Sequence, residues 1–202
     1  KRQQGYTGEV WLVLKPLCFR TRLSADVCYS QMRLFNRDTR FGEQCLRKAL
    51  ETDDLLYRRD GAAYNQADLS LFSHDGSVLA TLYAKEGELI GYKAKKGLSE
   101  YLDLDAPKGS LDPAVFFDPV YAGSLKSGGY VKLEGMEYYL LSTIEQLKVP
   151  ERLSAELRML DARFGLFFSH FAGYIDPGFL GTVTLEVMSP DDRVLRHKDV
   201  VA

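Results

Sequence analysis

The sequence predicts an all-β fold, a β-barrel or jelly roll, with one short helical connector. Short apolar segments that contain β-branched and aromatic residues recur along most of the chain, and glycine, proline and aspartate separate them. The last of these segments, residues 183–187, alternates apolar and polar side chains with the period of a strand. Many short strands joined by frequent turns are typical of barrels and jelly rolls.

Taken in chain order, the strand-like segments fall into two groups. The first group precedes the connector, and the second follows it and continues toward the C-terminus. The expected strands are residues 10–14, 19–23 and 29–35, then 67–72, 79–83, 88–92, 138–141 and 183–187.

The connector is expected at residues 37–60. Its apolar residues lie at helical spacing with charged residues between them, as Phe41, Cys45 and Ala49 illustrate. Residues 36–39 offer N-cap candidates. The sequence therefore predicts a helix between the two groups of strands.

Three local patterns mark the C-terminal part. Ser142-Thr-Ile-Glu145 has the spacing of a capping box and predicts a short helix. Residues 155–170 fit a helical face as well as a strand. Asp176-Pro-Gly178 predicts a tight turn, because proline presets φ and glycine accepts a positive φ. We expect this turn to bring Asp176 and Glu186 near each other on adjacent strands.

Bulk composition narrows the function classes. The chain has 202 residues and a net charge of −2, without a basic patch, so no nucleic-acid partner is expected. No apolar run is long enough to span a membrane, so no membrane partner is expected either. Three cysteines without metal-binding spacing favour a reducing, cytoplasmic location and argue against a zinc site.

A weak internal repeat suggests two β units. Gly8, Val10 and Leu12 recur 173 residues later as Gly181, Val183 and Leu185. We therefore expect residues 1–36 to be the closing strands of a first unit, 37–60 the helical connector, and 61–202 a second unit that lacks its last strand. The chain would then be a fragment of a longer tandem protein.

Two motifs stand out in the C-terminal part. One is Phe-Ala-Gly-Tyr-Ile-Asp-Pro-Gly-Phe-Leu-Gly at 171–181, followed by Val-Thr-Leu-Glu-Val at 183–187, and the other is Arg-Met-Leu-Asp-Ala-Arg-Phe-Gly at 158–165. Together they resemble the dCTP deaminase branch of the dUTPase-like family, and the second motif looks like the family's Arg-Ser-Ser-x-x-Arg-x-Gly segment. Similarity is strongest over residues 136–200, whereas 37–135 resembles only the long tandem members.

The resemblance implies a dUTPase-like β-clip that assembles as a homotrimer with active sites between subunits. It also implies zinc-free hydrolytic deamination of dCTP to dUTP, a deoxyribonucleotide triphosphate substrate that carries Mg²⁺, and Glu186 as the general base that activates water. Asp176 would bind the deoxyribose 3′-hydroxyl. The remaining residues expected at the site are Arg163 near the reacting atoms, and Ala172, Gly173, Tyr174 and Phe179 along the base pocket.

The sequence departs from the family pattern at the phosphate end. Met159 and Leu160 stand where the family has two serines, and Asp161 adds a negative charge. In the first unit, Val13 stands at the position of Glu186. These losses are complementary, so we expect a composite site in which an upstream unit supplies the missing serine and arginine.

Other interpretations remain open. The same fold could serve dUTP pyrophosphate hydrolysis, or this unit could be a degenerate copy that supports structure or senses nucleotides. Glu186 could be a solvent-facing strand residue, Asp176 only a turn former, and Arg163 a structural ion-pair partner. Gln31 and Arg33 could reach phosphate or remain solvated.

Overall fold

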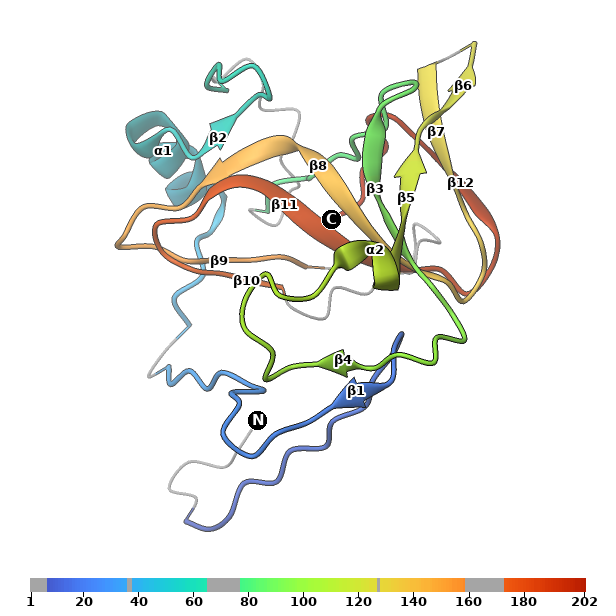
Figure 1. The fold of residues 1–202 in the computed structure, drawn as a ribbon. Coiled ribbons are helices and arrows are strands. Elements are labelled where there is room, and N and C mark those ends of the chain that lie inside the picture. Colours follow the sequence, from blue (N-terminus) through green and yellow to red (C-terminus); the bar gives the residue numbers. More distant parts are fainter. Residues whose placement is uncertain (1–6, 36–37, 65–76, 127, 159–172) are drawn as a thin grey trace.

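The computed structural model describes residues 7–35, 38–64, 77–126, 128–158 and 173–202. The elements in these ranges confirm the all-β prediction, since the described residues form mostly strands with two short helices (Figure 1). The helices are α1 (Glu43–Asp53) and α2 (Pro113–Phe116). The strands are β1 (Thr21–Arg22), β2 (Leu56–Tyr57), β3 (Leu89–Ala94), β4 (Leu102–Asp103), β5 (Phe117–Tyr121), β6 (Gly123–Leu125), β7 (Gly128–Leu133), β8 (Tyr138–Lys148), β9 (Ala155–Glu156), β10 (Tyr174–Ile175), β11 (Leu180–Met188) and β12 (Arg193–Arg196).

The long strand β8 organises the larger, five-stranded sheet. It pairs antiparallel with β11 along one edge, and with β3 and β2 along the other, while β5 extends the sheet beyond β3. Glu186 of β11 and Tyr92 of β3 both pair with Leu140 of β8. Because directly paired residues share a face, these three side chains lie on the same side of the sheet.

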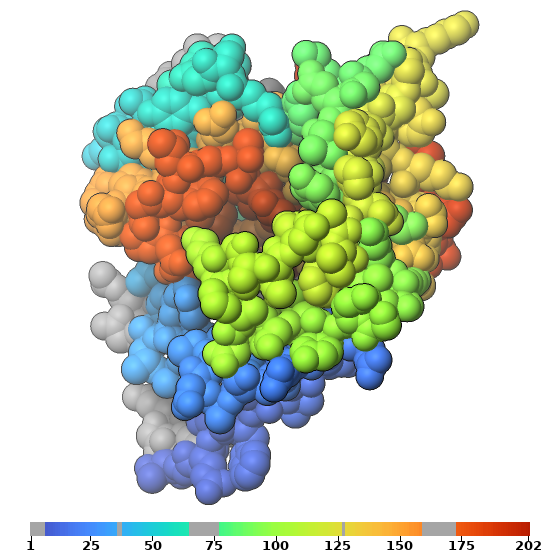
Figure 2. Space-filling model, in the orientation of Figure 1, coloured from blue at the N-terminus to red at the C-terminus, as the bar shows by residue number. Residues whose placement is uncertain are grey.

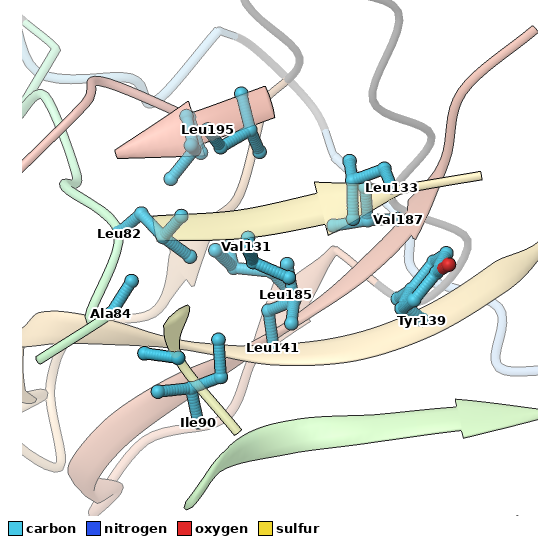
Figure 3. Packing of buried hydrophobic residues seen from close by; sticks show 13 residues of the cluster. Leu82, Ala84, Ile90, Val131, Leu133, Tyr139, Leu141, Leu185, Val187 and Leu195 are labelled. Atoms are coloured by element: carbon cyan, nitrogen blue, oxygen red, sulfur yellow. The ribbon is translucent and has the colours of Figure 1, made fainter. Parts of the chain in front are cut away.

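The core lies between this sheet and a three-stranded sheet of order β12-β7-β6. Figure 3 shows Leu133 of β7 and Leu195 of β12 on one side of the core, with Leu141 of β8 and Leu185 of β11 on the other. All four side chains are at most 3% exposed. Burying a leucine of this kind stabilises the fold by roughly 1.5–3 kcal/mol. Two sheets packed face to face in this way form the β-sandwich arrangement of jelly rolls.

Residues 80–83 and the C-terminal residues close one side of the sandwich. Hydrogen bonds join Ala80 N–H to the Ala202 carbonyl over 2.8 Å and Leu82 N–H to the Asp199 carbonyl over 2.9 Å. On its other side the segment bonds to β8, where Tyr83 N–H donates to the Ser142 carbonyl over 2.9 Å. The strand expected at 79–83 is thus present as isolated bridges that fill the gap between β3 and β2 along β8.

Helix α1 occupies the middle of the predicted connector. An ion pair of 2.6 Å between Arg47 and Glu43 supports its first turn, and Asp54 ends it in the left-handed conformation with φ 48°. The connector range also contains β2, which belongs to the main sheet. The division into two β units at these boundaries stays a prediction.

The N-terminal segment departs from the expected strands. Of residues 7–35, only β1 forms a ladder, a short parallel pairing with β4. Figure 2 shows this blue segment at the bottom of the molecule, against the light green chain that carries β4. Residues expected in strands instead expose apolar side chains, among them Trp11 at 81%, Val13 at 91% and Leu34 at 89%. The reason is that strand-forming residues need a neighbouring strand, and the described residues offer none here.

The helix predicted from the capping-box pattern is wrong. Ser142 and Glu145 lie within β8, where Tyr139, Leu141 and Thr143 are buried in strict alternation. Burial with the period of a strand outweighs the local capping signal. Glu145 is 4% exposed, and its carboxylate accepts hydrogen bonds from the residue 81 backbone and hydroxyl. The expected strand at 67–72, and nearly all of the ambiguous segment 155–170, lie outside the described residues.

Within the described ranges, neither helix has the length and apolar character needed to cross a membrane. The cytoplasmic location stays a prediction.

Candidate functional site

Glu186 lies on the outer face of the five-stranded sheet. Its neighbours in β11, Leu185 and Val187, are buried in the core, so strand alternation directs Glu186 to the opposite side. The residue is half-buried. The Glu186 side chain is therefore partly shielded from bulk solvent.

Tyr138 is the diagonal neighbour of Glu186 on that face. In the register of β8 and β11, Glu186 pairs with Leu140 and Met188 pairs with Tyr138. The Tyr138 hydroxyl donates a hydrogen bond to the Glu186 carboxylate. Burial, and then the negative charge of Glu186, raise the pKa of Tyr138 well above its ordinary value. The hydroxyl therefore keeps its proton and remains a donor.

The N-terminal chain reaches the same face. Burial, followed by the negative charge of Glu186, raises the pKa of the Cys18 thiol to about 11. The next residue, Phe19, packs edge-on against Phe116 and Phe117, with ring centroids 5.3 and 5.2 Å away. The N-terminal chain thus covers part of the surface around Glu186.

The predicted turn before β11 is present. The Phe179 N–H donates to the Asp176 carbonyl over 3.3 Å, and Gly178 has φ +81°, as a type II turn requires. Two backbone bonds of 2.8 Å link Gly178 and Phe179 to Val149. The turn is therefore anchored to the end of β8, while the Asp176 side chain stays 70% exposed.

Arg33 joins two of the predicted site residues. Its guanidinium lies over the ring of Tyr174, and its Nη2 is 3.6 Å from Asp176 Oδ1. The same nitrogen donates to Gln31 Oε1 over 2.6 Å. We call residues 18–33 the N-terminal strap, because one end approaches Glu186 and the other contacts Asp176. Sequence reasoning left the role of Arg33 open, and no local pattern reveals this contact.

Gly173 occupies a position where two backbones meet closely. A Cβ added there would lie 2.7 Å from the Leu157 carbonyl oxygen. The Leu157 N–H in turn donates to the Gly173 carbonyl over 2.5 Å. This contact extends the β9–β10 pairing, so a glycine is needed to bring Tyr174 to its place. Arg163 and Ala172 lie outside the described residues.

The strands next to the two predicted carboxylates, Asp176 and Glu186, belong to different sheets. β10, which leads into Asp176, pairs with β9, whereas Glu186 lies in β11 and pairs with β8. Glu186 is six positions beyond Leu180 (186 − 180), which is roughly 20 Å along a strand. The expectation that the turn places the two acids on adjacent strands is therefore wrong. The N-terminal strap is the element that contacts the surroundings of both.

The lysine-rich segment 93–96, at the end of β3 and just beyond it, borders a separate depression of about 290 Å³. Each of its ammonium groups pairs with a carboxylate: Lys93 with Glu134 at 2.8 Å, Lys95 with Asp118 at 3.5 Å, and Lys96 with Glu137 at 2.8 Å. These pairs balance the positive charge locally. Among the residues that the structure describes, no group of three or more histidine, cysteine or acidic side chains is placed to hold a metal ion.

Both the fold and the sequence of the chain resemble those of known proteins. The crystal structure of 2′-deoxycytidine 5′-triphosphate deaminase from Agrobacterium tumefaciens superposes with a TM-score of 0.63 and 27% identity, over 80% of this chain and 45% of that one. The fold is thus that of the dUTPase-like all-β proteins. The family described as 2′-deoxycytidine 5′-triphosphate deaminase (DCD), C-terminal domain, matches residues 48–198. The chain belongs to this dCTP deaminase family.

Curated relatives support the same family. A dCTP deaminase, dUMP-forming, of Hydrogenobaculum sp. (strain Y04AAS1) is 38% identical over 79 residues, which are 38% of this chain and 44% of the relative. The protein of the same name from Corynebacterium glutamicum (strain R) is 36% identical over 91 residues, 44% of this chain and 45% of the relative. The chain thus spans under half the length of the relatives that it matches.

Proposed function

We propose that the protein containing this chain deaminates dCTP by hydrolysis, with Glu186 as the general base. Glu186 accepts a proton from water as the oxygen attacks C4 of cytosine, and the C4 amine leaves as ammonia. The balanced reaction is dCTP plus water giving dUTP plus ammonia. Membership of the dCTP deaminase family supports the substrate.

One observation carries the role of Glu186. It is a half-buried acid on a sheet face, and it accepts a hydrogen bond from a neutral tyrosine. A general base must be partly shielded from water and held in one orientation. If Glu186 were only a solvent-facing strand residue, partial burial together with a hydrogen bond from the Tyr138 hydroxyl would not be expected.

We propose further that the site is composite. Cys18 and Arg33 of the N-terminal strap reach the two predicted carboxylates, Glu186 and Asp176. These contacts support a site to which residues before the connector contribute. An upstream unit would then provide a serine, which this unit lacks because Met159 and Leu160 stand at the serine positions, and an arginine.

The nucleotide would bring its own Mg²⁺. Magnesium prefers oxygen ligands and commonly binds through substrate phosphates. The triphosphate oxygens would hold the ion, and charge neutralisation of the phosphates is what it would supply. Asp176 would orient the sugar, and Tyr174, Phe179 and Gly173, with Ala172, would line the base.

Assembly as a homotrimer belongs to the same proposal. Exposed apolar side chains in the N-terminal segment, such as Trp11 and Leu34, support contacts with further protein. Mass measurement of the full-length protein in solution tests this directly.

A second candidate product follows from the relatives. Both are named dUMP-forming, which favours loss of pyrophosphate in addition to ammonia. Full-length protein should be incubated with dCTP, and separately with dUTP, in the presence of Mg²⁺, while ammonia and pyrophosphate are followed. Ammonia without pyrophosphate supports a dUTP product, and both together support a dUMP product. Absence of ammonia from dCTP contradicts the proposal and favours a degenerate copy.

A further inference from the structure

Tyr138 is the polar side chain best placed to act on Glu186. It lies on the outer face of the same sheet, one diagonal step away across the β8–β11 pairing. Diagonal neighbours on antiparallel strands are close enough for long side chains to touch. The Tyr138 hydroxyl uses this proximity to donate a hydrogen bond to the Glu186 carboxylate.

The neighbouring residue Tyr139 points to the opposite side of the sheet from Tyr138. Tyr139 is 2% exposed and points into the core, where its hydroxyl accepts the Glu134 N–H over 3.0 Å. Tyr138 points the other way because side chains alternate along β8. A half-buried tyrosine needs a partner for its hydroxyl, and Glu186 provides it.

The surroundings keep this contact partly dry. The strap residue Cys18 lies near both groups, and burial is the main reason that the pKa values of Cys18 and Tyr138 are raised. Shielding of this kind strengthens a hydrogen bond to a carboxylate. A carboxylate has about four lone-pair sites, so accepting one hydroxyl proton leaves it able to accept a proton from water as well.

We propose that Tyr138 is a positioning residue for Glu186, whose hydroxyl holds the carboxylate in the orientation needed to receive a proton from the attacking water. This inference rests on the proposed function. Tyr138 does not exchange protons in the reaction. Because its hydroxyl stays protonated, it donates to Glu186 throughout the neutral pH range.

Replacing Tyr138 with phenylalanine removes the hydroxyl and keeps the ring. For Tyr138→Phe in the full-length protein, kcat for ammonia release from dCTP should fall about tenfold or more, since hydrogen bonds to charged groups contribute about 1.5–3 kcal/mol. KM should change less than about twofold, because loss of an interaction that acts in the transition state lowers kcat without weakening ground-state binding. An unchanged kcat overturns the inference.

The split between kcat and KM separates positioning from a structural effect. Loss of the Tyr138 hydroxyl should lower kcat with little change in KM, whereas a general loss of packing would change both and lower the unfolding midpoint. Tyr92→Phe is the matched control, since Tyr92 flanks Leu140 on the other side of the same face. Its kcat should equal that of the wild type, and an equal loss of kcat in both variants contradicts a specific role for Tyr138.

A spectroscopic readout independent of turnover distinguishes the two proposals. In protein with ¹³C-labelled glutamate carboxyl groups, Glu186→Gln identifies the Glu186 signal. At one neutral pH, the chemical shift of this signal should differ between Tyr138→Phe and the wild type, because the carboxylate loses its donor. An equal chemical shift overturns the inference whatever the activity. If wild-type protein releases no ammonia although the chemical shift changes in Tyr138→Phe, the deaminase function fails and the Tyr138–Glu186 contact stands.

A second variant covers the case in which Tyr138→Phe unfolds. In Glu186→Gln, the ring ¹³Cζ signal of Tyr138 should shift because its charged acceptor is gone, and the signal of Tyr92 should stay in place. An unmoved Tyr138 signal counts against the contact.

Discussion

Arg33 of the N-terminal strap forms an ion pair with Asp176, at 3.6 Å between Nη2 and Oδ1. The two residues are separated by most of the chain, yet the contact brings a cation onto the turn that leads into β11. Asp176 is largely exposed, so charge pairing alone contributes little, about 0–1 kcal/mol. The ring of Tyr174 beneath the same guanidinium adds a contribution of similar size.

Arg33→Ala should weaken nucleotide binding. Without the guanidinium, Asp176 and Tyr174 lose the group that fixes both, and KM for dCTP should rise roughly threefold to tenfold, in line with the loss of about 1 kcal/mol. Arg33→Lys keeps the positive charge but lacks the planar guanidinium, so its KM for dCTP should lie between those of the wild type and Arg33→Ala. Steady-state kinetics of the full-length protein give the answer, and a KM that stays equal or decreases contradicts this role.

Cys18 should react slowly with alkylating reagents. The thiolate is the reactive form, and burial together with Glu186 raises the pKa of this thiol to about 11. At pH 8 only a small fraction is ionised, so the exposed Cys28 and Cys45 should be modified first.

The same reaction reports on the contact with Glu186. Glu186→Gln removes a negative charge, which lowers the pKa of Cys18 and increases its thiolate fraction at a given pH. Alkylation of Cys18, followed by mass spectrometry, should therefore be faster in this variant, while Cys45 provides the internal control. Equal rates at Cys18 in both proteins would show that the thiol does not sense the carboxylate.

Glu145→Gln should destabilise the fold. The buried carboxylate of Glu145 accepts the Thr81 N–H at 2.8 Å and the Thr81 hydroxyl at 2.6 Å. An amide retains one acceptor oxygen and places an NH₂ group where an acceptor is needed, at a cost of about 1–3 kcal/mol. Urea unfolding measures this loss. Thr81→Val in a double-mutant cycle should show coupling between the sites, and additive losses would argue against a shared network.

Gly173→Ala should disturb the base side of the site. Its Cβ would come within 2.7 Å of the Leu157 carbonyl oxygen, a backbone atom that cannot turn away. β9 and β10 would have to separate, which costs roughly 1–3 kcal/mol and moves Tyr174. Both the unfolding midpoint and the affinity for dCTP should decrease. A variant with wild-type stability and affinity would mean that the strands adjust without cost.

The fold class could be predicted because strand alternation and turn chemistry are local properties. The type II turn at Asp176-Pro-Gly178 and the inward residues of β11 follow from them directly. The capping-box pattern at Ser142 wrongly predicted a short helix, because it is a local signal that does not include the alternating burial along β8.

The candidate site was only partly accessible to such reasoning. The resemblance predicts Glu186 and Tyr174 as site residues, whereas the partners that the structure adds to them come from distant parts of the chain. Cys18 and Arg33 reach the site through the path of the strap, which no periodicity encodes. Tyr138 could have been found by writing out the β8–β11 register, because alternation places it on the face of Glu186.

The most direct test of the central claim is ammonia release from dCTP by full-length protein, compared between the wild type and Glu186→Gln under single-turnover conditions. Glu134→Gln, which alters an exposed acid paired with Lys93, serves as the control. The account predicts that Glu186→Gln binds dCTP and keeps its fold but releases no ammonia, while the control retains wild-type rates. Ammonia release by Glu186→Gln at the wild-type rate would contradict it.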